Sequence, residues 1–272
     1  MIIKEIDINE LKNIQLKMLA DIDRFCTAND INYSLAYGTL LGSIRHKGYI
    51  PWDDDIDIMM PRKDYEKFID QYVSDFYKVI DVNNNINYSL PFAKVHDTRT
   101  VMQEFADNDS CFGVYIDVFP IDNVPDSRIK EFIQFSLKSI LNIIHNIKNV
   151  KIASKRGFIK NSILFLGHIV LMPYSLHSCA VSMNKLSKHF SNTETKRSAI
   201  IAPANNSKSW INQCEVFTNY KRTKFENIEA SIITHYDDFL TSIYGDYMKL
   251  PPNEKQVSHH NFKVWWKYRI IP

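Results

Sequence analysis

The spacing of apolar side chains along the first part of the chain predicts a helix, a short strand, a second helix and another strand in close succession. Apolar residues recur every three or four positions from about 9 to 29, which is typical of an amphipathic helix. A β-prone run follows at 32–37, and Thr39 can cap a short helix after it. Polar and apolar residues alternate strictly at 55–60, which predicts a strand, and Pro61 then opens a further helix.

The pattern changes beyond this point. Weak strands are predicted at 78–82 and 92–95, a clear strand at 114–119, and long helices from 127 to about 190. The predicted elements of the last part are short strands around Ile200, Val216 and Phe225, a helix at 236–244, and a polar tail.

This order of elements predicts an α/β fold of the α+β type, in which a mixed β-sheet is flanked by helices. We expect a core at 1–125, a helical insert at 126–195, and a C-terminal segment at 196–272 that completes the core. Because glycine and proline are sparse and no internal repeat is visible, these segments are expected to form one compact unit.

Composition narrows the class of protein. The chain has 272 residues, of which 45% are hydrophobic, so it is long enough to bury a core. The 33 Lys and Arg residues are nearly balanced by 31 Asp and Glu residues, which gives no global field that would attract nucleic acid. The charged first residues do not resemble a secretory signal, so we expect a cytoplasmic protein.

The four cysteines, Cys26, Cys111, Cys179 and Cys214, show no CxxC pairing. This scatter argues against a disulfide framework and against a zinc knuckle, and we expect reduced thiols in the core.

The apolar run at 163–172 has two interpretations. It is either a buried core helix or a membrane-facing surface of a peripheral enzyme, which would give access to a lipid-linked substrate. At this length the run is too short to cross a bilayer.

The acidic run around residues 53–57 carries the clearest chemical signal. In a strand, Asp55 and Asp57 point to the same face, while Ile56 and Ile58 pack on the other. Two neighbouring carboxylates repel each other unless a cation offsets their charge, and oxygen ligands without Cys or His favour Mg²⁺ or Mn²⁺. The alternative is a solvated acidic loop.

Two further features favour a metal and phosphate site. Gly38 and Thr39 stand where a strand ends and a helix begins, and backbone N–H groups at such a junction bind phosphate. Asp117 lies in a second apolar strand, where an unpaired carboxylate is costly to bury, so we predict it as the third metal ligand.

Several cations and histidines are candidate phosphate contacts. Arg45 and Lys47 follow Gly38 and Thr39, which we call the glycine turn. The two cations either contact a diphosphate or form only a solvated basic cluster. Lys94 is either a phosphate ligand or a gatekeeper on an edge strand. His259 and His260 lie in the polar tail, where they either bind phosphate and move a proton or are merely exposed.

Longer motifs resemble a known family. The block YGTLLGSIRHKGYIPWDDDIDIMMPRKDY at 37–65, together with YIDVFPID at 115–122, YGDYMKLPP at 244–252 and SHH at 258–260, is similar to the LicD family of phosphocholine transferases and, distantly, to fukutin-related proteins. The resemblance implies a nucleotidyltransferase-like fold. It also implies that Gly38 and Thr39 contact the donor phosphates and that the metal ligands are Asp55, Asp57 and Asp117. Asp53, in phase with Asp55, would bind metal or act as a base.

If the donor carries choline, aromatic faces should hold its quaternary ammonium group. Candidates for this role, each of which could instead be a core residue, are Trp52, Tyr115, Trp210, Trp265 and Trp266.

The resemblance implies transfer of phosphocholine from CDP-choline, or a related CDP-activated donor, to a hydroxyl of a glycan or lipid-linked glycan. The acceptor would be a cell-surface precursor of the teichoic acid, lipopolysaccharide or capsule type, and Asp117 or Asp53 would take the acceptor proton. The enzyme would be cytoplasmic or peripheral on the inner face of the cell membrane, with no nucleic-acid partner. The alternatives are a CDP-ribitol or CDP-glycerol donor, nucleotidyl transfer at the α-phosphate, and a catalytically silent binding module.

Overall fold

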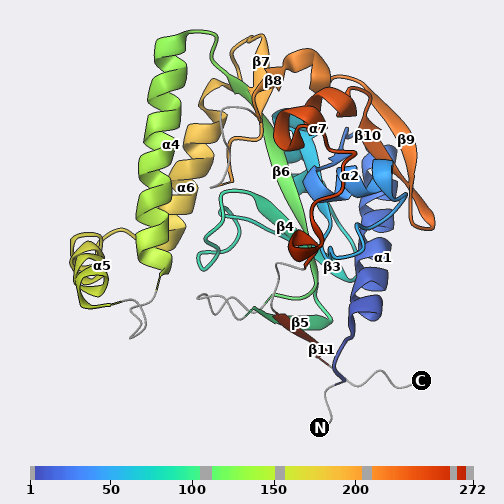
Figure 1. The fold of residues 1–272 in the computed structure, drawn as a ribbon, viewed down its shortest axis with the longest axis horizontal. Helices are drawn as coiled ribbons and strands as arrows, with labels where there is room; N and C mark the ends of the chain where they lie inside the picture. The colour runs from blue at the N-terminus through green and yellow to red at the C-terminus, as the bar shows by residue number, and fades with distance from the viewer. Residues whose placement is uncertain (1–3, 105–111, 151–156, 204–209, 258–261, 268–272) are drawn as a thin grey trace.

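A computed structural model describes residues 4–104, 112–150, 157–203, 210–257 and 262–267. The predicted α+β class is confirmed, because helices surround a mixed sheet whose strands run both parallel and antiparallel (Figure 1).

The sheet is framed by α-helices and short 3₁₀ helices (Figure 1). The α-helices are α1 (Ile8–Ala28), α2 (Tyr37–Arg45), α3 (Arg62–Gln71), α4 (Arg128–Asn149), α5 (Phe158–Val170), α6 (Leu176–Ser187) and α7 (Tyr236–Tyr244). Short 3₁₀ helices are η2 (Lys188–Phe190), η4 (Cys214–Phe217) and η5 (Asn253–Lys255).

The strands fall into one large sheet and two ribbons. Those of the large sheet are β1 (Ser34–Leu35), β2 (Asp57–Pro61), β3 (Tyr77–Ile80), β4 (Ala93–Asp97), β6 (Tyr115–Val124), β7 (Arg197–Ala199) and β8 (Asn212–Gln213). The ribbons pair β9 (Tyr220–Phe225) with β10 (Ile228–Ile233), and β5 (Thr100–Glu104) with β11 (Phe262–Trp266).

The centre of the large sheet is the parallel pair β2 and β6. The strand order is β1-β2-β6-β4-β3, and the far end of β6 continues the sheet through β7 and β8. Ile58 on β2 and Ile116 and Val118 on β6 are fully buried, as the alternation of the sequence predicted. The polar residues of the same two strands therefore lie together on the opposite side.

Several local predictions differ from the structure. The first residue of α2 is Tyr37 and its cap is Ala36, which makes no side-chain bond, so the prediction that Thr39 caps this helix is wrong. Val216 lies in a 3₁₀ turn and not in a strand. The predicted polar tail contains β11, which pairs antiparallel with β5, a strand that the sequence analysis did not predict.

The predicted helical insert contains α4, α5 and α6, and the exact boundaries of the three predicted segments stay a prediction. In Figure 1, α4 and α6 stand side by side next to the sheet, and α5 lies outside them. None of the residues of α5 is buried, so its interpretation as a core helix is wrong. Within the described ranges, no helix combines the length and apolar character needed to cross a membrane.

The described cysteines are free. Cys26 and Cys179 are buried and Cys214 is half-buried, in agreement with the expected reduced thiols. Cys111 lies outside the described residues.

A buried ion pair joins the core to the helical insert. Arg62, at the start of α3, donates to both carboxylate oxygens of Asp122 on β6, at 2.6 and 2.7 Å. A third nitrogen of the guanidinium donates to Asn184 of α6 at 3.1 Å. Because both charged side chains are buried, loss of either one would leave a desolvated charge without its partner.

We expect Arg62→Met to lower the free energy of unfolding by about 3–5 kcal/mol, because Asp122 keeps a buried charge. Urea unfolding monitored by circular dichroism measures this change. Lys188→Met is the matched control, since it removes a lysine whose pair with Glu66 is exposed, and such pairs contribute about 1 kcal/mol or less. Equal losses in the two variants would contradict the assigned role of Arg62.

Candidate functional site

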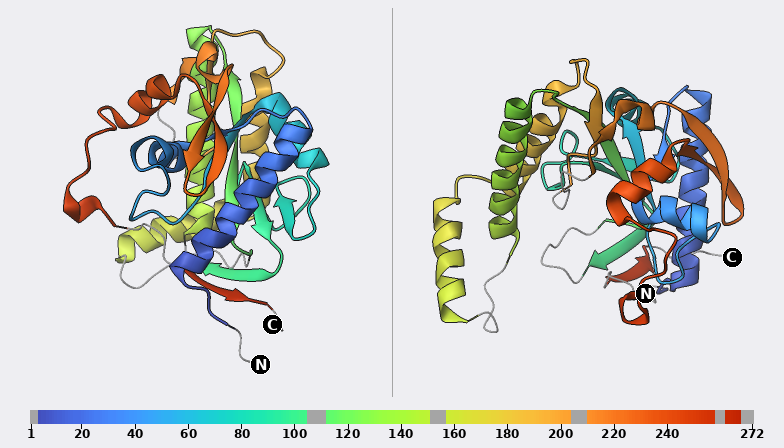
Figure 2. Two further views of the ribbon diagram at one scale, coloured as in Figure 1. Left: turned by 90° about the vertical axis from the view of Figure 1, so that its right-hand side faces the viewer. Right: turned by 45° about the horizontal axis from the view of Figure 1, so that its top comes forward.

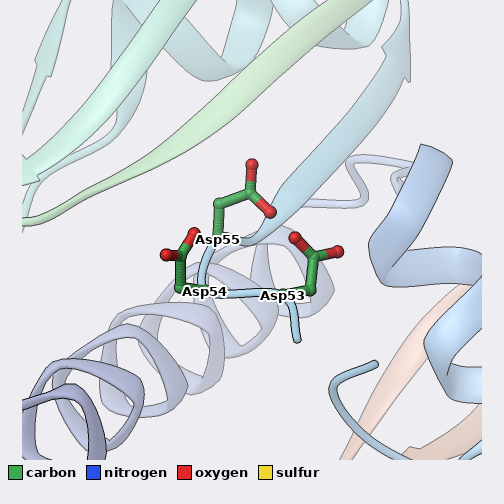
Figure 3. A group of neighbouring side chains, drawn as sticks. All are labelled: Asp53, Asp54 and Asp55. Atoms are coloured by element: carbon green, nitrogen blue, oxygen red, sulfur yellow. The ribbon is translucent and has the colours of Figure 1, made fainter. Parts of the chain in front are cut away.

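Three consecutive carboxylates gather just before β2. Asp53, Asp54 and Asp55 each place a carboxylate oxygen within 4.8 Å of the others (Figure 3). Asp54 is the buried member of this group. The backbone carbonyl of Asp54 accepts a hydrogen bond from Gln15 of α1 at 3.2 Å, which holds the acidic run against that helix.

Asp57 and Asp117 are neighbours across the central strand pair. They are register partners in the parallel ladder of β2 and β6, so their side chains emerge from the same region of the sheet. Lys94 is the register partner of Asp117 on the other side, in the antiparallel pairing of β4 with β6. Its ammonium group donates to Asp117 at 2.6 Å, so the buried lysine and this carboxylate form an ion pair.

Negative charge dominates this region. Burial raises the pKa of Asp57 well above the usual value for an aspartate, and the carboxylates of Asp55 and Asp117 raise it further. The charge of Lys94 acts in the opposite direction and does not cancel these effects. A divalent cation would relieve the same repulsion, and a set of carboxylate oxygens suits Mg²⁺ or Mn²⁺, so the residues present fit the expected metal.

The glycine turn touches the acidic run directly. A Cβ atom on Gly38 would lie 2.7 Å from a carboxylate oxygen of Asp53, so only glycine leaves that carboxylate in place. Thr39 is buried and its hydroxyl accepts a hydrogen bond from the backbone N–H of Asp57 at 2.9 Å. The structure therefore uses Thr39 to attach α2 to β2, next to the carboxylates.

A cleft of about 460 Å³ opens beside the acidic run. Its walls come from α2, the acidic run and the segment after α7, and include Gly38, Arg45, Trp52, Asp53, Tyr244, Tyr247 and Lys249. Arg45 donates to the backbone carbonyl of Tyr247 at 2.7 Å, which links two walls of the cleft. Cationic, acidic and aromatic groups thus meet around one space large enough for a small ligand.

The predicted aromatic residues are not all brought together. Trp52 lines the cleft. The ammonium nitrogen of Lys94 lies 3.3 Å from the centroid of the Tyr115 ring. Trp210 packs against Tyr37, with ring centroids 5.6 Å apart. Trp265 and Trp266 lie in the β5–β11 ribbon, where Trp266 donates to Glu10 of α1 at 2.9 Å.

The structure places only some of the predicted phosphate-binding residues at the cleft. Lys47 is exposed and is not part of the cleft wall, whereas Arg45 is. β4 lies between β3 and β6, so the interpretation of Lys94 as a gatekeeper on an edge strand is wrong. His259 and His260 lie outside the described residues.

Two tyrosines of the cleft wall were not expected from the sequence. Tyr244 and Tyr247 reach the cleft because α7 ends at Tyr244 and the chain then turns at Gly245, whose φ is +66°. Both tyrosines belong to the block at 244–252, so the signal was present as a motif although nothing local to that motif indicated a cleft.

His46 supports the orientation of Arg45. The ring nitrogen Nε2 of His46 accepts a hydrogen bond from Nε of Arg45 at 2.9 Å, which requires that nitrogen to be unprotonated. Partial burial lowers the pKa of His46 below 6.5, and the adjacent positive charge of Arg45 lowers it further.

We expect His46 to titrate below 6.5 in an NMR experiment on its ring protons. Since the folded state binds this proton less readily than the unfolded state, stability present at neutral pH should be lost as the pH falls through the folded pKa. His46→Gln, which keeps an acceptor, should lose part of this pH dependence, whereas the exposed control His189→Gln should keep it. A titration midpoint at or above 6.5 would overturn the assignment.

Comparison with known proteins agrees with this geometry. The sequence profile of the LicD/FKTN/FKRP nucleotidyltransferase domain matches residues 30–150. The match includes the glycine turn, the acidic run, Lys94 and Asp117.

Curated relatives extend the similarity. The lipopolysaccharide cholinephosphotransferase LicD of Haemophilus influenzae is 27% identical over 94% of this chain and 97% of its own length. An uncharacterized protein of Rickettsia typhi is 35% identical over 28% of this chain and 26% of its own length. A second uncharacterized protein, from Rickettsia prowazekii, is 40% identical over 23% of this chain and 24% of its own length. The chain thus resembles the LicD family both at the acidic site, where the profile matches, and along nearly the whole length of the Haemophilus protein.

Proposed function

We propose that the chain transfers phosphocholine from CDP-choline to a hydroxyl group of a cell-surface glycan precursor. The observation that carries this proposal is the cleft, in which the acidic run adjoins Arg45 and the aromatic side chains of Trp52, Tyr244 and Tyr247. The similarity to the Haemophilus cholinephosphotransferase supports choline as the transferred group and lipopolysaccharide as the type of acceptor.

The charges of the cleft suit a nucleoside diphosphate ester. Arg45 can form paired hydrogen bonds with phosphate oxygens, and its own bond to the carbonyl of Tyr247 holds the guanidinium on the cleft wall. The aromatic rings of Trp52 and Tyr244 can hold a quaternary ammonium group, which has no hydrogen to donate.

Asp55, Asp57 and Asp117 would hold Mg²⁺ or Mn²⁺. A bound divalent ion would neutralise charge on the diphosphate and on the departing CMP. Lys94 keeps the Asp117 carboxylate in a fixed position through its 2.6 Å bond.

The transfer itself needs positioning and one proton acceptor. The acceptor oxygen forms a bond to the phosphorus that carries choline, while the bond from that phosphorus to the CMP oxygen breaks. Of the two carboxylates expected as the base, Asp53 lines the cleft and Asp117 already accepts a hydrogen bond from Lys94. We therefore assign the hydroxyl proton to Asp53.

The location expected from the sequence, cytoplasmic or peripheral on the inner face of the cell membrane, is part of the proposal. Teichoic acid and capsule precursors remain alternative acceptors, and CDP-ribitol and CDP-glycerol remain alternative donors.

The donor can be tested by thermal unfolding with CDP-choline, CDP-ribitol, CDP-glycerol and CTP, each with and without Mg²⁺. We expect a Mg²⁺-dependent increase of roughly 5–10 °C with CDP-choline at a hundredfold excess over its Kd, because only the folded state binds it. Asp57→Asn should abolish turnover, while Asp75→Asn, an exposed control, should not.

Product analysis separates the remaining candidates. Release of CMP with a phosphocholine-bearing acceptor supports the proposal, and release of pyrophosphate would replace it by nucleotidyl transfer. Equal shifts with all four nucleotides would remove choline as the recognised group. Binding without turnover across a panel of glycan acceptors would favour a silent binding module.

Gly38→Ala provides a second test. The added methyl group must displace the Asp53 carboxylate, whose oxygen lies 2.7 Å from the Cβ position, so kcat should fall by about a hundredfold. Stability should be unchanged or higher by up to about 1 kcal/mol, because alanine favours a helix more than glycine does. Wild-type kcat in this variant would contradict the role of Asp53.

Gly42→Ala, on the same helix, is the matched control. Its Cβ would clash with the backbone carbonyl oxygen of Gly48, which cannot move as a side chain can. We expect this variant to lose about 1–3 kcal/mol of stability, as overpacked sites do.

A further inference from the structure

Helix α4 directs its polar residues toward the protein and its apolar residues toward solvent. Glu131, Gln134 and Lys138 are only 2–4% exposed. Glu131 accepts a hydrogen bond from Arg197 at 2.8 Å, and Gln134 donates to the carbonyl of Leu186 at 3.1 Å. The opposite side carries apolar residues that are 46–73% exposed, namely Ile129, Phe132, Ile133, Leu137, Ile140 and Ile143.

Helix α5 continues this apolar surface. Its outward apolar residues are 53–87% exposed and include Phe158, Ile159, Ile163, Phe165, Leu166 and Val170. Gly167 allows α5 to approach α4, because a Cβ there would lie 2.9 Å from Ile147. Lys148 at the end of α4 donates to the carbonyl of Leu171 at 3.2 Å. The right-hand view in Figure 2 shows α5 as the outermost element of the insert.

We call the exposed apolar residues of α4 and α5 the insert face. An apolar helix face of this extent is normally covered, since contiguous exposed apolar patches are rare on soluble monomers. The insert face therefore requires an apolar occupant.

Charge identifies the occupant. Residues 127–190 contain ten Lys and Arg residues and a single acidic residue, Glu131, although the whole chain is nearly neutral. Lys130 and Lys160, which belong to α4 and α5, are exposed. A second copy on this face would bring two strongly basic segments together, which like-charge repulsion disfavours. The occupant must offer both apolar groups and negative charge.

We propose that the insert face docks on the surface of a bilayer that contains anionic lipid. Apolar side chains of α4 and α5 would enter the boundary between headgroups and acyl chains, and the lysines would contact lipid phosphates. This proposal does not depend on the donor or on the reaction, and a lipid-linked acceptor would be presented at the same surface.

The test is flotation of the full chain with vesicles of phosphatidylcholine alone or with phosphatidylglycerol. We expect at least tenfold stronger binding to the vesicles with phosphatidylglycerol, and weaker binding at high salt. The double variant I163D/L166D should lower binding at least tenfold, whereas I8D/V73D, which alters exposed apolar residues outside the insert, should bind like wild type.

Charge is tested separately. K130E/K160E should lose the preference for phosphatidylglycerol, and K63E/K224E, which changes exposed lysines elsewhere, should keep it. Absence of vesicle binding, or binding that I163D/L166D leaves unchanged, overturns the proposal. Analytical sedimentation tests the alternative of self-association. If the wild type forms a dimer that I163D/L166D dissociates, and does not bind vesicles, the insert face is a dimer interface. Donor binding measured on the same variants distinguishes failure of this proposal from failure of the proposed reaction.

Discussion

Repulsion among half-buried carboxylates is the constraint on which the site depends. The parallel pairing of β2 with β6 places Asp57 beside Asp117, and Asp55 adds a third negative charge within electrostatic reach. Burial strengthens these interactions because the protein interior screens charge less than water does. A fold that keeps such a group must offset it, and here Lys94 does so in part through its bond to Asp117.

The surrounding elements hold the carboxylates in place against this repulsion. Thr39 ties the start of α2 to the backbone of Asp57, and Gln15 of α1 binds the backbone of Asp54. Tyr49 donates to Gln15 at 2.9 Å, and Glu226 in the β9–β10 turn accepts from the backbone N–H of Tyr49 at 2.9 Å. Separate parts of the chain thus position the acidic run before any ligand arrives, which is how binding sites avoid the cost of reorganisation.

The helical insert differs from the core in which side chains it buries and which it exposes. In the core, apolar residues lie inside, whereas α4 buries Glu131 and Lys138 and exposes a row of isoleucines. The pattern of the sequence correctly predicted a helix at this position. It could not show which side faces the protein, because periodicity defines a stripe and not the direction in which the stripe points.

The sequence by itself predicted the central strands of the core and the carboxylates that lie beside them. Alternation around Ile56 and Ile58 predicted a buried strand with carboxylates on its other face, because side chains in a strand alternate. The tertiary structure decided what depends on contacts distant in sequence. It paired Lys94 with Asp117, brought Tyr244 and Tyr247 to the cleft, and joined β5 to β11 across most of the C-terminal half of the chain. Such contacts depend on packing and strand register between remote segments, which no local pattern encodes.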